Sequence, residues 1–410
     1  IGEAGNDQAT GGAGDDVFFG GAGNDTFIGG AGNDTAVIDS GDTIVLTGAD
    51  RFLSVANVTV NGASGEIDRY EEVETLDIGG SIVDGAFVSG GSGFDLTDDF
   101  RILNSSGELQ STHATIDDAL GSVTVSGGST TDTIVVADGA TVSADSLTGS
   151  LTAGLTILGS GTLNAATFED DLTIDVADVT IDGLRFTVGS GDTAITIAAS
   201  GDGASILNTA IAESGGNASA TGVDVTDAAV DITIDNSDFN LLGTGINLIS
   251  DYDATASISG STLVGNTVGI ALDGNGASGD IDIENNIFID NTTAGVDLDE
   301  TSGTYTDGGD IRIYLNRFEI PTSGDGVDAN GLTISGSVDT SLTETLGFNT
   351  FNTFVDDQGV ADTSSVAIDS TQYTSLTGYV IEGTSSGGET ATFNEPDSEL
   401  VLDLTNTGTV

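Results

Sequence analysis

A block of nine-residue repeats at the start of the sequence constrains the fold more than any other feature. Residues 2–37 read as four consecutive units, GEAGNDQAT, GGAGDDVFF, GGAGNDTFI and GGAGNDTAV, with the pattern G-G-x-G-x-D-x-(apolar)-x. Glycine permits the positive φ of tight turns, and each x-Asp-x-apolar-x segment predicts a short strand with one inward side chain. The inward apolar positions are Ala9, Phe18, Phe27 and Ala36. The block therefore predicts a small coil of strands in which the same turn recurs.

These turns offer oxygen ligands for a hard divalent cation. Calcium prefers carboxylates and backbone carbonyls, and a glycine-rich turn followed by an aspartate supplies both. We therefore expect Ca²⁺ to be the cofactor. The predicted metal-site residues are Asp7, Asp16, Asp25, Asp34, Gly14, Gly23, Gly32, Asn24 and Asn33.

The four units resemble the RTX (repeats-in-toxin, hemolysin-type) family, whose nonapeptides form a calcium-bound β-roll. In that family two units make one turn of the roll. The resemblance therefore implies that Asp7 stacks with Asp25 and Asp16 with Asp34, each pair 18 residues apart. It also implies roughly two complete sites. The first unit departs from the pattern at Glu3, and a glycine-rich linker is the alternative interpretation of the block.

The segment after the block is predicted to be a β connector. Its stretches at 42–52 and 71–82 resemble the strand-rich segment that often follows RTX blocks. Their alternation of apolar and polar residues favours strands over helices. We expect residues 40–110 to carry no functional site.

A second, longer repeat occupies most of the remaining chain. Its apolar anchors are spaced 24 to 30 residues apart, at Ile157, Ile181, Ile206, Ile234, Ile258, Ile283 and Ile313. A second strand follows each anchor from the second unit onward, with inward positions at Ile195, Val223, Ile246, Ile270, Val296 and Val327. Short strands at such a period predict a parallel β-solenoid, in which stacked coils bury columns of apolar side chains.

These coils resemble the pectate-lyase-like, right-handed parallel β-helix. The resemblance rests on residues 113–142 and on ENNIFIDNTTAGVDL at 284–298. It implies a short capping helix over Thr115–Leu120. The recurring Asn208, Asn236 and Asn285 are expected to stack as a ladder inside a turn, with ligand binding as the alternative.

The predicted fold class is thus all-β, a β-solenoid with four parts. They are an RTX calcium-binding β-roll at 1–39, a β-rich connector at 40–110, a right-handed parallel β-helix at 111–345, and C-terminal β coils with a cap at 346–410. The sequence begins at Ile1 and contains no Met, so we expect a processed form or an internal segment of a longer protein.

The charge limits the partners. The chain has 66 acidic residues against 6 basic ones, all Arg, for a net charge of −60. Nucleic acids and anionic membranes attract clustered Lys and Arg, so we expect neither nucleic acid binding nor membrane insertion. There is no cysteine for a disulfide or a zinc–thiolate site.

Parallel β-helices of this kind also carry polysaccharide lyases, glycoside hydrolases and alginate epimerases, so an enzyme is one hypothesis. Epimerisation or elimination beside a uronate needs a base, a proton donor and a cation. The chain lacks the Asp-Pro-His motif of the epimerases, and its single histidine, His113, precedes the coils. Arg185 and Arg317 are expected to hold acidic neighbours, and acidic pairs such as Asp98–Asp99 arise readily among so many carboxylates. We predict no catalytic residues and no enzymatic activity.

The predicted function is structural. We expect a calcium-dependent, secreted subunit of a bacterial surface layer (S-layer), sheath, filament or adhesin, exported by type I secretion and located extracellularly at the cell surface. Self-association through calcium-bridged or solenoid contacts is the expected partnership, with cell-surface polysaccharide as a second partner. The alternative is a carbohydrate-active enzyme or a polysaccharide-binding module on a lyase- or epimerase-like β-helix. A sugar-binding groove lined with aromatic rings is disfavoured by the content of 6 Tyr, 16 Phe and no Trp.

Overall fold

The chain forms two compact units, which are described separately. The first comprises Ile1–Val142 with Ser146–Thr167, and the second comprises Ser143–Asp145 with Phe168–Val410. The computed structural model describes residues 4–39, 42–46, 52, 58–62, 67–78, 81–83, 86–89, 93–142, 150–161, 166–169, 171–215, 218–249, 252–273, 279–300, 311–314, 316–320, 330–336, 345–347, 350–353, 367–368, 376–377, 380–383 and 392–393.

The first unit begins with the predicted roll. Its first strands are β1 (Gln8–Ala13), β2 (Val17–Phe19), β3 (Thr26–Ala31) and β4 (Thr35–Ile38). β1 pairs with β3 and β2 with β4, both in parallel, which confirms the offset of two repeat units per turn. Ala9 therefore lies beside Phe27, and Phe18 beside Ala36. The inward apolar positions predicted from the repeat are buried or half-buried.

The roll has a third turn that no nonapeptide encodes. β7 (Ile67–Glu71) pairs in parallel with β3, and β8 (Thr75–Ile78) pairs in parallel with β4. Between β4 and β7 the chain forms β5 (Thr43–Val45) and β6 (Val58–Asn61), which are antiparallel to each other, and β6 is also antiparallel to β7. The predicted connector thus contributes strands to the roll itself.

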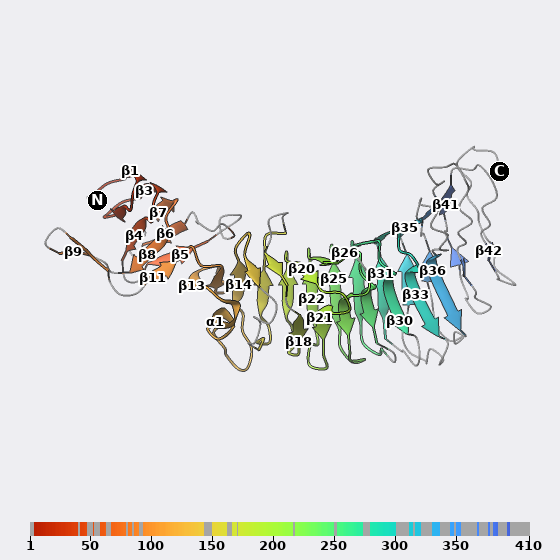
Figure 1. Cartoon of the computed structure of the whole chain (residues 1–410). Helices are drawn as coiled ribbons and strands as arrows, with labels where there is room; N and C mark the ends of the chain where they lie inside the picture. Colours follow the sequence, from red (N-terminus) through yellow and green to blue (C-terminus); the bar gives the residue numbers. More distant parts are fainter. Residues whose placement is uncertain are drawn as a thin grey trace. The chain divides into compact units, whose positions relative to one another are not determined.

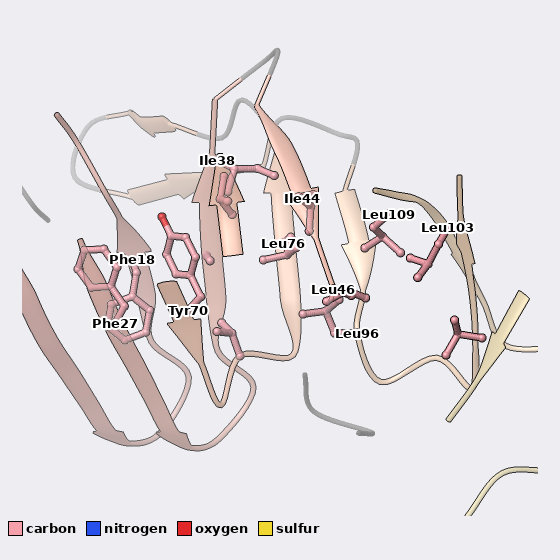
Figure 2. Close-up of a cluster of buried hydrophobic side chains, with 14 of the residues drawn as sticks. Phe18, Phe27, Ile38, Ile44, Leu46, Tyr70, Leu76, Leu96, Leu103 and Leu109 are labelled. Atoms are coloured by element: carbon pink, nitrogen blue, oxygen red, sulfur yellow. The ribbon is translucent and has the colours of Figure 1, made fainter. Parts of the chain in front are cut away.

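The core of this unit runs from the roll into the strands that follow it. The Phe18 and Phe27 ring centroids lie 5.3 Å apart, and the Tyr70 ring stacks on Phe27 at 5.4 Å. Figure 2 shows these rings beside Leu76 and Ile44. Leu96, Leu103 and Leu109 extend the same buried cluster. Aromatic stacking and continuous apolar burial bind the third turn firmly to the repeat turns.

The rest of the first unit combines antiparallel and parallel strand pairs with one short helix. Its elements are β9 (Ser81–Val83), β10 (Ala86–Val88), β11 (Gly93–Asp95), β12 (Phe100–Leu103), β13 (Leu109–His113), α1 (Ile116–Leu120), β14 (Thr133–Val136), β15 (Thr141–Val142) and β16 (Thr156–Leu158), and β17 (Thr167–Phe168) lies at the boundary. The predicted capping helix is confirmed: Thr115 Oγ1 accepts the Asp118 backbone N–H at its start. No helix within the described part of the chain is long and apolar enough to cross a membrane.

The second unit is a parallel β-solenoid whose strands form three sheets (Figure 1). The first sheet contains β19 (Thr180–Asp182), β22 (Ala204–Leu207), β25 (Ile232–Asp235), β28 (Ala256–Ser259), β31 (Ile281–Glu284), β34 (Ile311–Tyr314), β37 (Thr345–Gly347) and β40 (Leu376–Thr377). The second contains β20 (Arg185–Val188), β23 (Ala210–Glu213), β26 (Asp238–Asn240), β29 (Thr262–Val264), β32 (Ile287–Ile289), β35 (Arg317–Ile320), β38 (Thr350–Thr353) and β41 (Val380–Gly383). The third contains β18 (Leu172–Ile174), β21 (Thr193–Ile197), β24 (Thr221–Val225), β27 (Thr244–Leu248), β30 (Val268–Asp273), β33 (Ala294–Glu300), β36 (Asn330–Gly336), β39 (Ala367–Ile368) and β42 (Thr392–Phe393).

The predicted apolar columns are confirmed in this solenoid. The anchors from Ile181 to Ile313 are register partners in successive strands of the first sheet, and all are buried. The column from Ile195 to Val296 is formed in the third sheet. The predicted Val327 lies outside the described residues, and Leu332 is the register partner of Val296.

The predicted asparagine ladder forms, but on the exposed side of the turn. Asn236 Nδ2 donates to Asn208 Oδ1 at 2.6 Å. Asn208, Asn236 and Asn285 have φ values of 48°, 50° and 57° and are exposed, so the expectation that they lie inside the turn is wrong. They occupy the left-handed bend between the first two sheets, a conformation that asparagine tolerates well. The residue after each bend points inward instead. The buried ladder consists of Thr209, Ser237, Ser261, Asn286 and Asn316, each backbone N–H donating to the next side-chain oxygen.

Candidate metal centre

Acidic side chains line up in two columns beside the turns of the roll. The first turn column consists of Asp7, Asp25 and Asp68; Asp7 and Asp25 precede β1 and β3, and Asp68 is the second residue of β7. The second turn column consists of Asp16, Asp34 and Glu74, which precede β2, β4 and β8. Each acid lies two residues before an inward apolar side chain, so the strand register places every column in line.

Each column is held by a carboxylate that accepts a backbone hydrogen from the preceding turn. Asp25 Oδ1 accepts the Asp7 N–H at 2.7 Å, and Asp68 Oδ1 accepts the Asp25 N–H at 2.9 Å. In the second column, Asp34 Oδ1 accepts the Asp16 N–H at 2.8 Å, and Glu74 Oε2 accepts the Asp34 N–H at 2.6 Å. One oxygen of each acceptor carboxylate therefore ties adjacent turns together.

The remaining oxygens of the central aspartates point to a cation. Asp25 is 1 % exposed and Asp34 is fully buried, yet Asp25 Oδ2 and Asp34 Oδ2 accept no hydrogen bond. A buried carboxylate oxygen without a partner is costly, and a cation removes that cost. The residues therefore fit a calcium ion in each column.

Glycines complete the cradles around these oxygens. A Cβ atom on Gly11 would overlap Asp16 Oδ2 and lie 2.7 Å from the Gly29 carbonyl oxygen. A Cβ atom on Gly20 would lie 2.7 Å from Asp68 Oδ2 and 3.4 Å from Asp25 Oδ2. The oxygens thus converge where only glycine leaves space, which suits a small cation with oxygen ligands.

The family comparison agrees with this geometry. Residues 1–36 match the model of the RTX calcium-binding nonapeptide repeat in four copies. The N-terminal block is an RTX repeat block. RTX repeats bind calcium, so Ca²⁺ is the ion that Asp25 and Asp34 would hold, neutralising their buried charge. RTX proteins are typically exported by type I secretion, which fits an extracellular location.

The other comparisons add little. The crystal structure of the extracellular lipase LipA from Serratia marcescens is similar over 72 % of this chain and 32 % of that one, with 15 % identity and a TM-score of 0.15. The chain thus spans about a third of the lipase's length, and so low a score carries no argument. No curated protein matches the sequence.

The predicted turn residues of the RTX block take two roles. Gly14, Gly23 and Gly32 have φ values of 103°, 144° and 153°, and a Cβ atom on Gly32 would overlap the Gly14 carbonyl oxygen. These glycines are therefore needed for the close stacking of turns. Asn24 and Asn33 are exposed and belong to an outer ladder. The Asn24 N–H donates to Asn6 Oδ1 at 3.0 Å, and the Asn33 N–H donates to Asp15 Oδ1 at 2.9 Å.

Sequence reasoning missed the third member of each column. Asp68 and Glu74 lie in the predicted connector, where no functional site was expected. The missed signal is local: Asp68-Arg69-Tyr70 and Glu74-Thr75-Leu76 repeat the acid-x-apolar half of the RTX unit without its glycines. Tyr70 and Leu76 then occupy the inward positions of Phe27 and Ala36.

The electrostatics around the first column are strongly negative. Burial raises the pKa of the Tyr70 hydroxyl well above its usual range, and the Asp68 and Asp25 carboxylates raise that pKa further. The Tyr70 hydroxyl oxygen would lie 3.2 Å from a Cβ atom on Gly20, so it borders the same cradle. Within the described ranges, no three acidic or histidine side chains gather in a way that could hold a metal, and the cradles therefore need backbone carbonyl ligands as well.

The residues considered for other chemistry are dispersed. His113 is half-buried at the end of β13 and shares a hydrogen bond of 2.8 Å with Ser111 Oγ. Arg185 and Arg317 lie in β20 and β35 of the second unit. Burial raises the pKa of Asp98, and the nearby His113 partly offsets this rise.

Proposed function

We propose that this chain is part of a secreted, calcium-dependent structural protein of the bacterial cell surface, such as a surface-layer, sheath, filament or adhesin subunit, and that it is not an enzyme. The buried, unpartnered oxygens of Asp25 and Asp34 carry the proposal. In a chain with a net charge of −60, these carboxylates oppose folding of the roll until a divalent cation arrives. Low calcium inside the cell would then favour export, and calcium outside would favour folding.

The solenoid supports a scaffold role. Its interior is filled by columns of Ile, Val, Leu and Phe. The buried ladder that ends at Asn316 and a second buried pair, Asn266 and Asn291, accept backbone N–H groups at its bends. Each coil adds about 4.8 Å of parallel stacking. A filled, regularly paired solenoid suits a stiff spacer or lattice element.

The outward rows of the coils support self-association. In the third sheet the row Thr196, Asp224, Asn247 alternates with buried residues, and Asn247 Nδ2 donates to Asp224 Oδ1 at 2.8 Å. In the first sheet the row reads Thr180, Ser205, Thr233, Ser257 and Asp282. Small polar side chains give flat faces, and carboxylates on two copies can share a calcium ion. Cell-surface polysaccharide bridged by calcium is the second proposed partner.

The test is sedimentation velocity with electron microscopy of the purified chain, first in millimolar calcium and then in excess chelator. A third sample contains magnesium at the same ionic strength, because magnesium screens charge but fits a calcium site poorly. Sheets, tubes or filaments in calcium alone would support the proposal. A folded monomer in all three samples would contradict it and favour the alternative of a polysaccharide-binding module or carbohydrate-active enzyme.

A further inference from the structure

We propose that the third turn of the roll, which lies outside the nonapeptides, completes two calcium sites, one in each turn column. Asp68 contributes to the site in the first column, and Glu74 with the Glu72 carbonyl contributes to the site in the second. The inference rests on the calcium binding of the roll within the proposed function and extends it to residues that the repeat pattern does not assign.

In the second column, the geometry between the first and second turns recurs between the second and third turns. Between the first and second turns, Asp16 Oδ2 and the Gly29 carbonyl oxygen converge on Gly11. Between the second and third turns, Asp34 Oδ2 and the Glu72 carbonyl oxygen converge on Gly29. The Glu72 carbonyl thus takes the place that Gly29 holds one turn earlier, although Glu72 is not in a repeat.

The backbone of the third turn is bent to make this possible. Glu72 has a φ of 54°, a left-handed conformation that glutamate rarely adopts. The Glu74 and Thr75 N–H groups both donate to the Asp34 carbonyl oxygen, at 3.2 Å and 3.0 Å, as the Thr35 N–H does to Asp16 one turn earlier. Backbone strain at a turn that copies a metal-binding turn is consistent with a functional constraint.

In the first column, the third turn contributes a side-chain carboxylate instead of a backbone carbonyl. Asp68 Oδ1 accepts the Asp25 N–H, while Asp68 Oδ2 and Asp25 Oδ2 gather around Gly20. Two carboxylate oxygens facing one buried point repel each other unless a cation lies between them.

The buried oxygens without a hydrogen-bond partner lie between the second and third turns of the roll. Among the described residues, the carboxylate oxygens that are buried without a hydrogen-bond partner are Asp25 Oδ2 and Asp34 Oδ2, and both belong to the cradles that contain third-turn groups. Without ions in these cradles, the third turn would bury negative charge in the roll with no positive charge to compensate it. With ions, calcium ties β7 and β8 to strands that lie 40 or more residues earlier in the sequence.

Isothermal titration calorimetry on the full chain measures the number of calcium ions directly. The test variant combines Asp68→Asn and Glu74→Gln, because each amide oxygen can still accept the turn's backbone hydrogen while the amide nitrogen cannot bind calcium. The control combines Glu71→Gln with Asp238→Asn, which removes the same charge outside both columns. We expect the test variant to lose one ion per column and the control to match the original chain.

The outcomes separate this inference from the proposed function. An original chain that binds no calcium would overturn both. An unchanged ion count in the test variant, with normal binding otherwise, would overturn only the third-turn sites.

Thermal unfolding distinguishes lost ligands from lost structure. Because the substitutions remove charge repulsion, the test variant should melt no earlier than the original chain in chelator, yet gain less on calcium addition. A variant that melts earlier in chelator and keeps the full calcium gain would assign Asp68 and Glu74 a packing role only.

A local probe is also available. Tyr70 is the one tyrosine in residues 1–167 and borders the first-column cradle. Terbium, a luminescent calcium substitute, should be sensitised by Tyr70, and Asp68→Asn should lower that signal more than Glu74→Gln. Equal signals in both variants would argue against the first-column site.

Discussion

Replacing Asp34 by Asn should make the roll more stable in chelator and less stable in calcium than in the original chain. Asp34 is fully buried in the second turn column, with Oδ1 bonded to the Asp16 N–H and Oδ2 without a hydrogen-bond partner. Asparagine keeps the Oδ1 acceptor and turns its amide nitrogen toward the Glu72 carbonyl oxygen. In chelator, an oxygen–oxygen repulsion becomes a hydrogen bond, and the variant should be more stable by about 1–3 kcal/mol.

Calcium changes the sign of that difference. An ion at a thousandfold excess over its Kd stabilises the folded state by roughly 4.1 kcal/mol per site. Asp34 Oδ2 lines the cradle beside Gly29, so the original chain gains this amount from an ion there. The variant loses this gain and should be less stable than the original chain by roughly 1–3 kcal/mol in calcium.

Urea unfolding followed by the near-UV circular dichroism of Tyr70, in calcium and in chelator, measures both differences. Asp15→Asn is the matched control, since Asp15 is exposed one turn earlier and its Oδ1 accepts the Asn33 N–H in the outer ladder. The reasoning fails if Asp34→Asn destabilises the roll equally in both conditions.

Three further predictions follow from the same contacts. Asp16→Ala combined with Asp25→Ala should abolish calcium binding at the cradles beside Gly11 and Gly20 and leave the second unit folded, as judged by calorimetry and limited proteolysis; an unchanged number of bound ions would contradict those sites. Asn286→Ala should lower the free energy of unfolding by about 2–5 kcal/mol, because it leaves the buried Ser261 N–H and Ile258 carbonyl unpaired. Asn285→Gly at the exposed bend should change stability little. Equal losses for both variants in urea titrations would contradict the ladder. Gly29→Ala should weaken calcium binding, since its Cβ fills a cradle, and unchanged calorimetry would disprove that cradle.

The repeating parts of this fold could be predicted from sequence because the spacing of the repeats determines the strand register. Ile181 and its successors recur at a nearly constant spacing, and parallel stacking then requires them to pair. The offset of Asp7 to Asp25 follows equally from the nonapeptides. Where an apolar residue alternates with a polar one on every coil, only one register buries the apolar face.

The ladder was misplaced because two neighbouring residues were equally suitable. Asn285 and Asn286 are adjacent asparagines, and composition does not show which one adopts the left-handed bend. Gly183 and Gly260 hold the same bend in other coils, with φ values of 68° and 60°. Aligning those glycines with Asn285 would have placed the bend at Asn285 and the buried ladder one residue later, at Asn286.

The third turn was missed because an insertion hides its period. Asp7 and Asp25 are 18 residues apart, but Asp25 and Asp68 are 43 apart, and Asp34 and Glu74 are 40 apart. Strands β5 and β6 occupy part of the extra length. The third turn also lacks the paired glycines, so only the acid-x-apolar triplets and the strand pairing reveal it.

Hydrogen–deuterium exchange with and without calcium tests the central claim most directly. The amide hydrogens of Asp7, Asp16, Asp25 and Asp34 are bonded to column carboxylates, which calcium would fix in place. Calcium should therefore slow exchange across residues 4–39 and 67–78 and leave strands β18–β33 unchanged. Exchange that is indifferent to calcium in 67–78, or that changes equally along the solenoid, would contradict a calcium-dependent roll of three turns.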